Sequence, residues 1–389
     1  MSTLCMGPLA GIKVVEAGGI GPVPFCGMLL ADLGAEVLLI ERRTRDGDPL
    51  GVVTPDKRGA DLLHRGKKSI GLDLKSSSGA DVAMRLVANA DVLIEGFRPG
   101  VMERLGLGPE TCLETNPRLV YGRLSGWGQH GLLSHRAGHD INYIALAGAL
   151  FHGGPADRPP TAPPTLVGDI GGGAMLLATG LLAALLHVRQ SGRGQVIDAA
   201  ISDGAALLTA LLVGLQQQGL WVDARQRNFL DGGAPWYDSY ECADGNFIAI
   251  GALEPDFYRE LLQKCGLGED PLFELQFDTA SWPQQKEKLK QLFRTRTRTE
   301  WNDTFAGSDA CFAPVLNLSE ARSHPHNRER RTFVNIDGVE QPAPAPRFSL
   351  TGTEISRGPP ARGEHTEEIL EASGFSAGDI AALREAAVI

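Results

Sequence analysis

Short runs of apolar residues alternate with stretches of helical pattern through the first third of the chain. The runs that predict strands are Ile12–Ala17, Glu36–Glu41, Ser69–Leu74, Asp91–Glu95 and Leu119–Leu124. Helices are predicted between these runs at Phe25–Leu33 and Gly79–Asn89. This alternation predicts a parallel sheet covered by helices, and nearly continuous apolar strands are typical of burial on both faces. The fold class is therefore α/β.

The pattern shifts towards longer helices after the fifth predicted strand. It predicts a helix at His139–Gly153, a proline-rich loop at Arg158–Pro164 and a strongly apolar helix at Gly171–Arg189. A strand at Gln195–Ala199 then leads into a long helix that extends through Gln218.

A new region begins after Asp231. Its predicted elements are strands at Trp236–Glu241 and Phe247–Gly251 and helices near Pro255–Cys265, Pro283–Arg294 and Thr299–Phe305. Beyond Pro342 the chain is proline-rich and extended until a last helical stretch near Thr366–Ala387. We therefore expect a large domain over residues 1–200, a linker helix over 201–230 and a small α+β domain over 231–334.

Composition and charge narrow the classes of partner. The chain has 389 residues, of which 43% are hydrophobic and 22% charged, as in soluble globular proteins. The formal net charge is −10 and no Lys/Arg-rich tail is present, so nucleic acid is not expected as a partner. The start of the sequence lacks signal-peptide features, and the apolar run Ala174–Leu186 is too short to span a bilayer, so no membrane partner is expected.

The six cysteines are scattered, and no two of them have the spacing of a zinc site. Scattered thiols in a chain of this size indicate a reduced, cytoplasmic protein. His324 and His326 lie two residues apart on either side of a proline, without an evident third ligand. We therefore expect no metal site.

The turn after the first predicted strand has part of a dinucleotide-binding pattern. Gly19 and Gly21 follow that strand, and Glu41 ends the next one about 20 residues later. However, Pro24 stands at the third glycine position, which normally allows close packing of helix and strand, and Pro22 also interrupts the pattern. A tight turn in an α/β unit therefore explains this segment better than a nicotinamide cofactor does.

Positive charge is concentrated early in the chain. The cluster is made of Arg42, Arg43, Arg45, Lys57, Arg58, Arg65, Lys67, Lys68 and Lys75, with Arg98 and Arg104 following. Several of these residues come just after predicted strands, where ligands bind in open α/β sheets. Two interpretations remain open: a ligand that carries several phosphates, or a solvated face that also bears aspartates.

Three titratable residues are candidates for chemistry. His139 lies in a Gly-His-Asp-Ile-Asn-Tyr string at the start of a predicted helix, where a capping role is the alternative. Asp169 precedes three glycines and the apolar helix, which suits an N-cap but also a site where backbone approaches a ligand. Glu254 follows a predicted strand and precedes Pro255, so its alternative role is a cap or a surface acid.

Taken together, these motifs resemble the family III CoA-transferase superfamily over nearly the whole chain. The strings that carry the resemblance are PLAGIKVVEAGGIGPVPFCGMLLADLGAEVLLIER, DVLIEGFRPGVMERLGLGPE, AGHDINYIALAG, LVGDIGGGAMLL and GRGQVIDAAISDG. Within the superfamily, His139 in the GHD string and a single glycine near Glu254 resemble the α-methylacyl-CoA racemase branch. Transferases usually carry another residue in place of that histidine, and many have a glycine-rich loop near the start of the small domain.

The resemblance implies a fold and a binding mode. Each chain would have a Rossmann-like large domain, completed by residues 335–389, and would form an interlocked homodimer with the active site where domains of two subunits meet. Acyl-CoA would be the substrate, with no further cofactor. The residues expected to bind it are Arg42, Leu72, Asp73, Leu74, Lys75, Gly96, Phe97, Arg98, Arg104, Gly138, Asn142 and Tyr143.

The resemblance also implies a reaction, the interconversion of (R)- and (S)-2-methylacyl-CoA thioesters by 1,1-proton transfer through an enolate. Such a step needs two bases on opposite faces of the α-carbon. His139, oriented by Glu254 and supported by Asp140, would serve one face, and Asp169 the other. The backbone amides of Ile170 and Gly171 would hold the enolate oxygen.

Two other functions remain open. One is transfer of CoA between carboxylic acids, with Asp169 as the nucleophile. The other is an acyl-CoA-binding protein without catalysis, which the coexistence of His139, Asp169 and Glu254 disfavours because binding alone needs none of them.

Overall fold

The computed structural model describes residues 7–43 and 61–389, and the chain divides into two compact units. Within the described residues, the first unit contains the chain up to Ala147, then Pro163–Leu208 and Arg331–Ile389; the second contains Gly148–Ala162 and Thr209–Arg330. The sequence predicts 148–162 as part of the large domain and 201–230 as one linker helix. In the structure, 148–162 joins the second unit and the linker is divided between the two.

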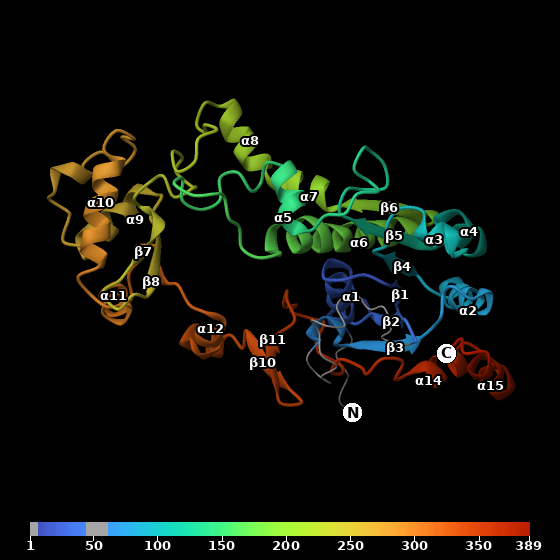
Figure 1. The fold of residues 1–389 in the computed structure, drawn as a ribbon. Coiled ribbons are helices and arrows are strands. Elements are labelled where there is room, and N and C mark those ends of the chain that lie inside the picture. Colours follow the sequence, from blue (N-terminus) through green and yellow to red (C-terminus); the bar gives the residue numbers. More distant parts are fainter. Residues whose placement is uncertain (1–6, 44–60) are drawn as a thin grey trace. The chain divides into compact units, whose positions relative to one another are not determined.

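A six-stranded parallel sheet forms the centre of the first unit (Figure 1). Its strands are β1 (Lys13–Ala17), β2 (Glu36–Glu41), β3 (Lys67–Gly71), β4 (Val92–Glu95), β5 (Val120–Ser125) and β6 (Gln195–Ala200). Their order across the sheet is β3-β2-β1-β4-β5-β6, and every neighbouring pair is parallel. The α/β prediction is thus confirmed, and the order reverses between β1 and β4, where such sheets bind ligands outside their carboxyl ends.

Helices cover both faces of this sheet because neighbouring strand residues point to opposite sides. Val14 and Val120 belong to the core cluster under α1 (Pro22–Asp32) and α6 (Leu176–Ser191). The next residue in each strand, Val15 and Tyr121, belongs to the cluster under α2 (Ser77–Ala88). Both faces are therefore apolar, as the nearly continuous apolar strands predicted.

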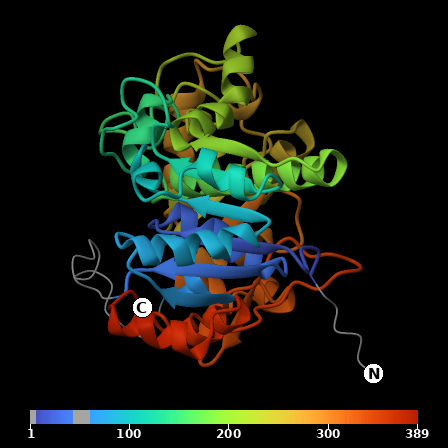
Figure 2. The same cartoon turned by 90° about the vertical axis from the view of Figure 1, so that its right-hand side faces the viewer.

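The last stretch of the chain lies along β3, so segments far apart in sequence are side by side in Figure 2, where the red helices adjoin the blue sheet. His365 N–H donates to the Ser69 carbonyl at 2.9 Å, and Asp73 N–H donates to the Val388 carbonyl at 2.9 Å. Two helices form here, α14 (Thr366–Ala372) and α15 (Ala377–Glu385), where one was predicted. Gly374, with φ of +79°, separates them.

The apolar helix begins earlier than predicted. A π-helical segment, η2 (Leu166–Met175), runs directly into α6, so the helical stretch Leu166–Ser191 has the length and apolar character of a membrane span, contrary to the shorter run read from the sequence. Leu177 and Leu181, both fully buried, pack into the core over Gly122 of β5. One side of this stretch therefore packs in the core of the first unit, although only 39% of its most apolar 18-residue window is buried.

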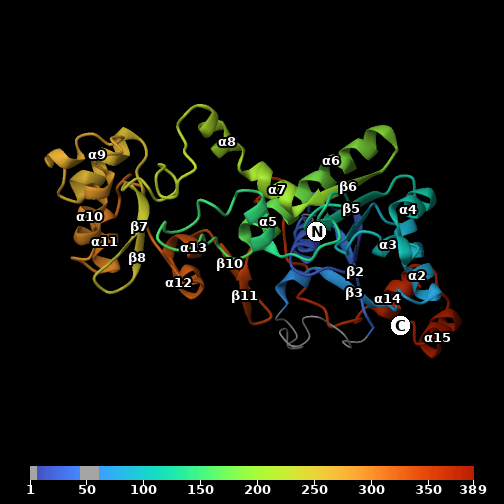
Figure 3. The same ribbon diagram turned by 45° about the horizontal axis from the view of Figure 1, so that its top comes forward.

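Two glycines let η2 and α7 (Ile201–Leu208) approach each other closely, and Figure 3 shows α7 beside the start of α6. A Cβ on Gly204 would lie 1.8 Å from the Gly172 carbonyl oxygen, and one on Gly172 would lie 2.6 Å from the Ala205 nitrogen. The glycines after Asp169 were expected to let backbone approach a ligand. Gly172 instead serves contact between two helices.

The second unit has its own core and sheet. Three antiparallel strands, β7 (Tyr237–Glu241), β8 (Phe247–Gly251) and β9 (Phe312–Pro314), lie in chain order. The helices around them are α9 (Pro255–Lys264), α10 (Trp282–Phe293) and α11 (Arg298–Phe305). Trp236, Phe293 and Trp301 are fully buried in the cluster that these elements share.

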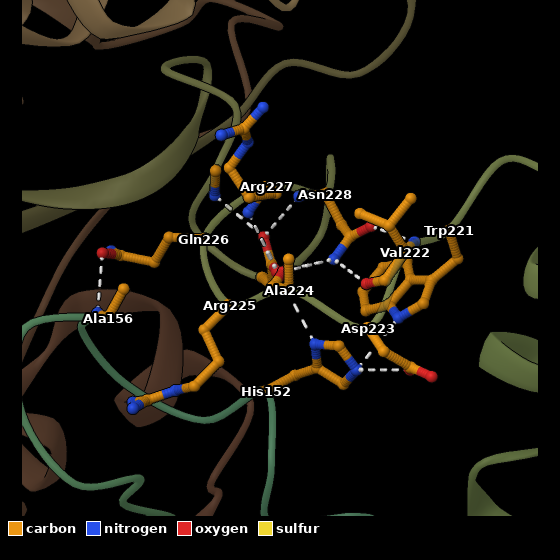
Figure 4. A network of polar contacts seen from close by, with 12 residues as sticks. His152, Ala156, Trp221, Val222, Asp223, Ala224, Arg225, Gln226, Arg227 and Asn228 are labelled. Atoms are coloured by element: carbon orange, nitrogen blue, oxygen red, sulfur yellow. Dashed lines mark hydrogen bonds and ion pairs between the residues drawn. The ribbon is translucent and has the colours of Figure 1, made fainter.

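The predicted long helix through Gln218 is broken into α7 and α8 (Ala210–Gln217), and irregular chain follows. A polar network holds that chain to the 148–162 segment within the second unit (Figure 4). Trp221 Nε1 donates to His152 Nε2 at 3.1 Å, and Arg225 donates to the carbonyls of Gly153 and Gly154 at 2.9 and 3.2 Å. Hydrogen bonds made by side chains, rather than the backbone hydrogen bonds of a helix, therefore hold this linking chain in place.

The predicted helix at His139–Gly153 is also shorter than expected: α5 (Asp140–Leu146) stops before Gly148, whose φ is +79°. Several short elements were not predicted. They are η1 (Leu62–His64), α3 (Val101–Arg104), α4 (Pro109–Thr115), η3 (Pro271–Phe273), β9, α12 (Leu318–Ser323), α13 (Pro325–Glu329), β10 (Phe333–Ile336) and β11 (Val339–Pro342).

The close contact between η2 and α7 predicts how a substitution at Gly204 changes the free energy of unfolding. We expect Gly204→Ala to destabilise the protein by on the order of 3 kcal/mol, because its new methyl group meets backbone that cannot move aside. Gly214→Ala is the control: a Cβ there meets nothing within 4 Å, and alanine should stabilise α8 by up to about 1 kcal/mol. Urea unfolding followed by circular dichroism measures both, and equal midpoints for the two variants would contradict the packing argument.

Candidate active site

The loop after β5 packs against α5. Gly126 lies directly under the Tyr143 ring, since a Cβ on Gly126 would come within 2.1 Å of that ring. Trp127 meets the same ring edge-on with centroids 4.8 Å apart, and the Tyr143 hydroxyl donates to the Gly138 carbonyl. Tyr143 thus fixes the chain that leads into the start of α5.

The Asp140 carboxylate joins α5 to η2. Its Oδ1 accepts the backbone N–H groups of Gly168 and Asp169, both at 2.8 Å, and the residue is only 7% exposed. A carboxylate with two amide donors is strongly held, because charge-assisted hydrogen bonds are short and strong. Asp140 therefore places the start of α5 beside Asp169.

His139 occupies the N-cap position of α5. Its backbone N–H donates to Asn142 Oδ1 at 3.1 Å, while its imidazole is exposed. The predicted group Gly138, His139, Asp140, Asn142, Tyr143 and Asp169 is thus brought together within the first unit. The imidazole itself remains open to solvent or to a ligand.

The Asp169 carboxyl has an unusual pKa for an aspartate. Burial of the half-buried side chain and the neighbouring Asp140 charge raise its pKa from 3.8 to about 6, while His139 acts in the opposite direction. Desolvation and like charge both disfavour ionisation. A carboxyl with a pKa near 6 can both accept and return a proton close to neutral pH.

The expected oxyanion site is not formed as predicted. Asp169 does not cap a helix, because η2 begins at Leu166 and winds past it. The Ile170 N–H donates to the Thr165 carbonyl at 3.1 Å and is therefore occupied. Gly171 lies beyond the first turn of η2, so its amide is not at an open helix end. The assignment of Ile170 and Gly171 to the enolate oxygen is therefore wrong for this structure.

The residues expected to bind CoA follow the carboxyl ends of neighbouring strands. Arg42 follows β2, Leu72–Lys75 follow β3 and Gly96–Arg98 follow β4, while Arg104 ends α3. Parallel strands bring these ends to one edge of the sheet. Arg42, Asp73, Lys75, Arg98 and Arg104 are exposed, Leu74 and Phe97 are half-buried, and the Leu72 side chain is buried in the core.

Part of the basic cluster has a structural role. Lys67 is completely buried against Glu16, with Nζ at 2.7 Å from Oε2, and Arg65 is buried against Asp32 at 2.6 Å. Lys68 pairs with Glu368 at 2.9 Å. The phosphate interpretation is therefore wrong for Arg65 and Lys67, while Arg45, Lys57 and Arg58 lie outside the described residues.

The first βα turn packs against the neighbouring loop. A Cβ on Gly18 would meet the Phe97 ring at 2.2 Å, and one on Gly96 would lie 3.3 Å from the Gly19 Cα. Helix α1 begins directly at Pro22. These contacts agree with the tight-turn interpretation of the segment.

Glu254 belongs to the second unit. It precedes α9 at the N-cap position, its carboxylate is exposed, and its side chain makes no capping hydrogen bond. Glu254 is thus at the predicted N-cap position but does not cap the helix through its side chain, and its exposure fits the alternative of a surface acid. Within the first unit, His139 and Asp169 come together without it.

Sequence reasoning missed Trp127 and the buried pair of Glu95 and Arg123. Arg123 Nε donates to Glu95 Oε1 at 2.8 Å, with both residues nearly inaccessible. The available signal was a charged residue inside each of two otherwise apolar strands, since buried charges are normally paired.

The position of the Asp140 carboxylate beside Asp169 predicts that removing its charge lowers the pKa of Asp169. We expect Asp140→Asn to lower the pKa of Asp169 from about 6 towards its ordinary value, because asparagine keeps an acceptor oxygen but removes the negative charge. Carbon-13 NMR titration of the Asp169 carboxyl, assigned with Asp169→Asn, measures this change. Asp157→Asn removes an exposed carboxylate and should leave the titration unaltered. An unchanged pKa in Asp140→Asn would show that burial alone sets it.

Comparisons with known proteins identify the family. A family model described as CoA-transferase family III matches residues 9–366. The chain is 46% identical to mouse alpha-methylacyl-CoA racemase over 98% of this chain and 97% of the relative, and 44% identical to the human protein with the same coverages. A CaiB/BaiF family protein from Brucella suis has a similar solved structure, with a TM-score of 0.82 and 25% identity over 95% of this chain and 100% of that one. The chain therefore belongs to CoA-transferase family III.

Proposed function

We propose that this chain interconverts the (R) and (S) forms of 2-methylacyl-CoA thioesters by moving the α-proton through an enolate. The observation that carries the proposal is the Asp140 bridge, which holds Asp169, with a pKa of about 6, beside the start of α5 and His139. The similarity to the mouse and human racemases supports the same reaction.

Two bases account for inversion of the α-carbon. A thioester acidifies its α-proton, so one base removes that proton and a second returns a proton to the opposite face. His139 is exposed, and its imidazole is a side chain that commonly serves as a general acid or base. Asp169 is the partner base, because its raised pKa lets it exchange a proton in the same pH range.

The carboxyl edge of the large sheet would bind the CoA part of the substrate. Exposed Arg42, Lys75, Arg98 and Arg104 offer positive charge to its phosphates, and arginine matches phosphate geometry with paired donors. CoA enters as part of the substrate. The reaction moves protons only, so the proposal includes no metal and no redox cofactor.

An interlocked homodimer, in which Glu254 of one chain completes the site of the other, is the assembly that we propose. Large apolar side chains are exposed on the helices that border the linking chain, including Met175, Leu186, Leu207, Leu208 and Leu211. Exposed apolar side chains on this scale support association with a second copy. Glu254 is exposed and makes no capping hydrogen bond.

Deuterium exchange tests the reaction. We expect the purified protein to incorporate deuterium at the α-carbon of a single-enantiomer 2-methylacyl-CoA in D₂O while the substrate loses enantiomeric purity. His139→Ala and Asp169→Asn should each reduce racemisation about 10²–10⁴-fold, because each removes one base. The matched control, Asp157→Asn, changes an exposed aspartate of the second unit and should retain activity.

A different product would contradict the proposal. Transfer of CoA to an added carboxylate without α-proton exchange, with a covalent adduct on Asp169, would make this chain a CoA-transferase. Binding of the acyl-CoA with neither reaction would leave a binding protein.

Mixing two inactive variants tests the shared site. If Glu254 completes the site that holds the partner's His139 and Asp169, a mixed dimer of Asp169→Asn and Glu254→Ala chains contains one intact site. Refolding an equal mixture should then restore about one quarter of wild-type activity, since half the dimers are mixed and half of their sites are intact. A site built within each chain would stay inactive in every dimer, and a mixture without activity would therefore overturn the shared-site proposal.

A further inference from the structure

Two buried charged residues face each other beneath the loop that follows β4. Glu95 ends β4 and is 1% exposed, while Arg123 lies in β5 and is 7% exposed. The two residues are direct register partners in the parallel ladder. Arg123 Nε donates to Glu95 Oε1 at 2.8 Å.

The other polar atoms of this pair hold the loop itself. Glu95 Oε2 accepts the Phe97 N–H at 2.7 Å, which fixes the chain two residues beyond the strand. Arg123 Nη1 and Nη2 donate to the two carboxylate oxygens of Glu103 at 2.8 and 3.3 Å. One guanidinium thus connects the end of β4 with α3, the helix that ends at Arg104.

Neighbouring contacts fix both ends of the same segment. The Tyr121 hydroxyl, on the same face of β5, donates to the Leu107 carbonyl just after α3 at 2.8 Å. At the other end, Glu95 belongs to β4 itself. The segment from Glu95 to Leu107 is therefore held to the sheet at both ends.

Stability alone does not explain why charged residues occupy these positions. Burying two ions costs several kcal/mol each, and well-packed apolar residues in their place are often as stable or more stable. Burial raises the pKa of Glu95 even though Arg123 and the Phe97 amide oppose the rise. Because burying the Glu95–Arg123 pair is costly, its presence is better explained by the need to hold the loop after β4 in one geometry.

We propose that Arg123, acting through Glu95 and Glu103, is a positioning residue that sets Arg98 and Arg104 at the spacing needed to bind the phosphates of acyl-CoA. This inference rests on the proposed function, because it assigns the Gly96–Arg104 segment to the CoA part of the substrate. Arg123 itself does not touch the substrate. Its effect is on the affinity for the nucleotide end and not on the proton transfer.

Two substrates separate positioning from general stability. The variants are Arg123→Met, which removes the charge, and Arg123→Lys, which keeps the charge but not the fork of donors that reaches both glutamates. Each is assayed with 2-methylacyl-CoA and with the corresponding pantetheine thioester, which lacks the nucleotide phosphates. The control is Arg294→Met, because Arg294 is an exposed arginine of the second unit and lies outside the segment from Glu95 to Leu107.

We expect Arg123→Met to raise KM for the CoA thioester about tenfold, with kcat within twofold and KM for the pantetheine thioester unchanged. Arg123→Lys should fall between Arg123→Met and the wild type, and Arg294→Met should stay within twofold of the wild type. Equal losses with both substrates, or an unchanged KM for the CoA thioester in folded Arg123→Met or Arg123→Lys, would overturn the proposal.

Calorimetry with CoA itself separates this inference from the proposed function. A wild-type protein that binds CoA but does not racemise would end the proposed reaction, while about tenfold weaker CoA binding by Arg123→Met or Arg123→Lys would still support the positioning role. Equal CoA affinity of wild type and variants would overturn the positioning role and leave racemisation intact. A wild-type protein that binds no CoA would overturn both.

Discussion

All strands of the large sheet run in the same direction, and this places three glutamates near one edge. Glu41 and Glu95 end β2 and β4, and Glu16 is the next-to-last residue of β1. Each stands in an apolar run, where an unpaired charge would be costly to bury. Each has a partner from another element: Lys67 for Glu16, the Ser69 hydroxyl for Glu41 and Arg123 for Glu95. The edge that offers loops to a ligand therefore rests on carboxylates that are ion-paired or hydrogen-bonded.

The Asp140 bridge has two effects that depend on one another. It holds η2 against α5 through two amide donors, and the same negative charge raises the pKa of Asp169. A neutral side chain could supply the hydrogen bonds without the electrostatic effect. The structure therefore couples the position of a candidate base to its acidity through one buried carboxylate.

The sheet could be predicted from sequence because its apolar runs are bounded by clear turns, and the bounds of β2 and β8 agree to the residue. The start of the apolar helix could not be predicted in the same way. An aspartate before three glycines has the pattern of an N-cap, whereas in the structure the π-helical segment begins before Asp169 and includes it. Lys67 likewise lies in a polar stretch, and only its partner Glu16, 51 residues earlier, explains its burial. Local sequence patterns therefore predict helices and strands. Ion-pair partners that are distant in sequence determine which charged side chains are left to bind a ligand.

The C-terminal segment along β3 has a consequence for how the protein is made. β3 is an edge strand, and Gly66 and Ser69 bond to Arg357 and His365, which are synthesised about 290 residues later. At about 5–20 residues per second on the ribosome, the edge waits roughly 15–60 s for its cover. An uncovered edge is a template for pairing with other chains. The nascent protein is therefore open to misassembly along β3 from the synthesis of that strand until translation has almost ended.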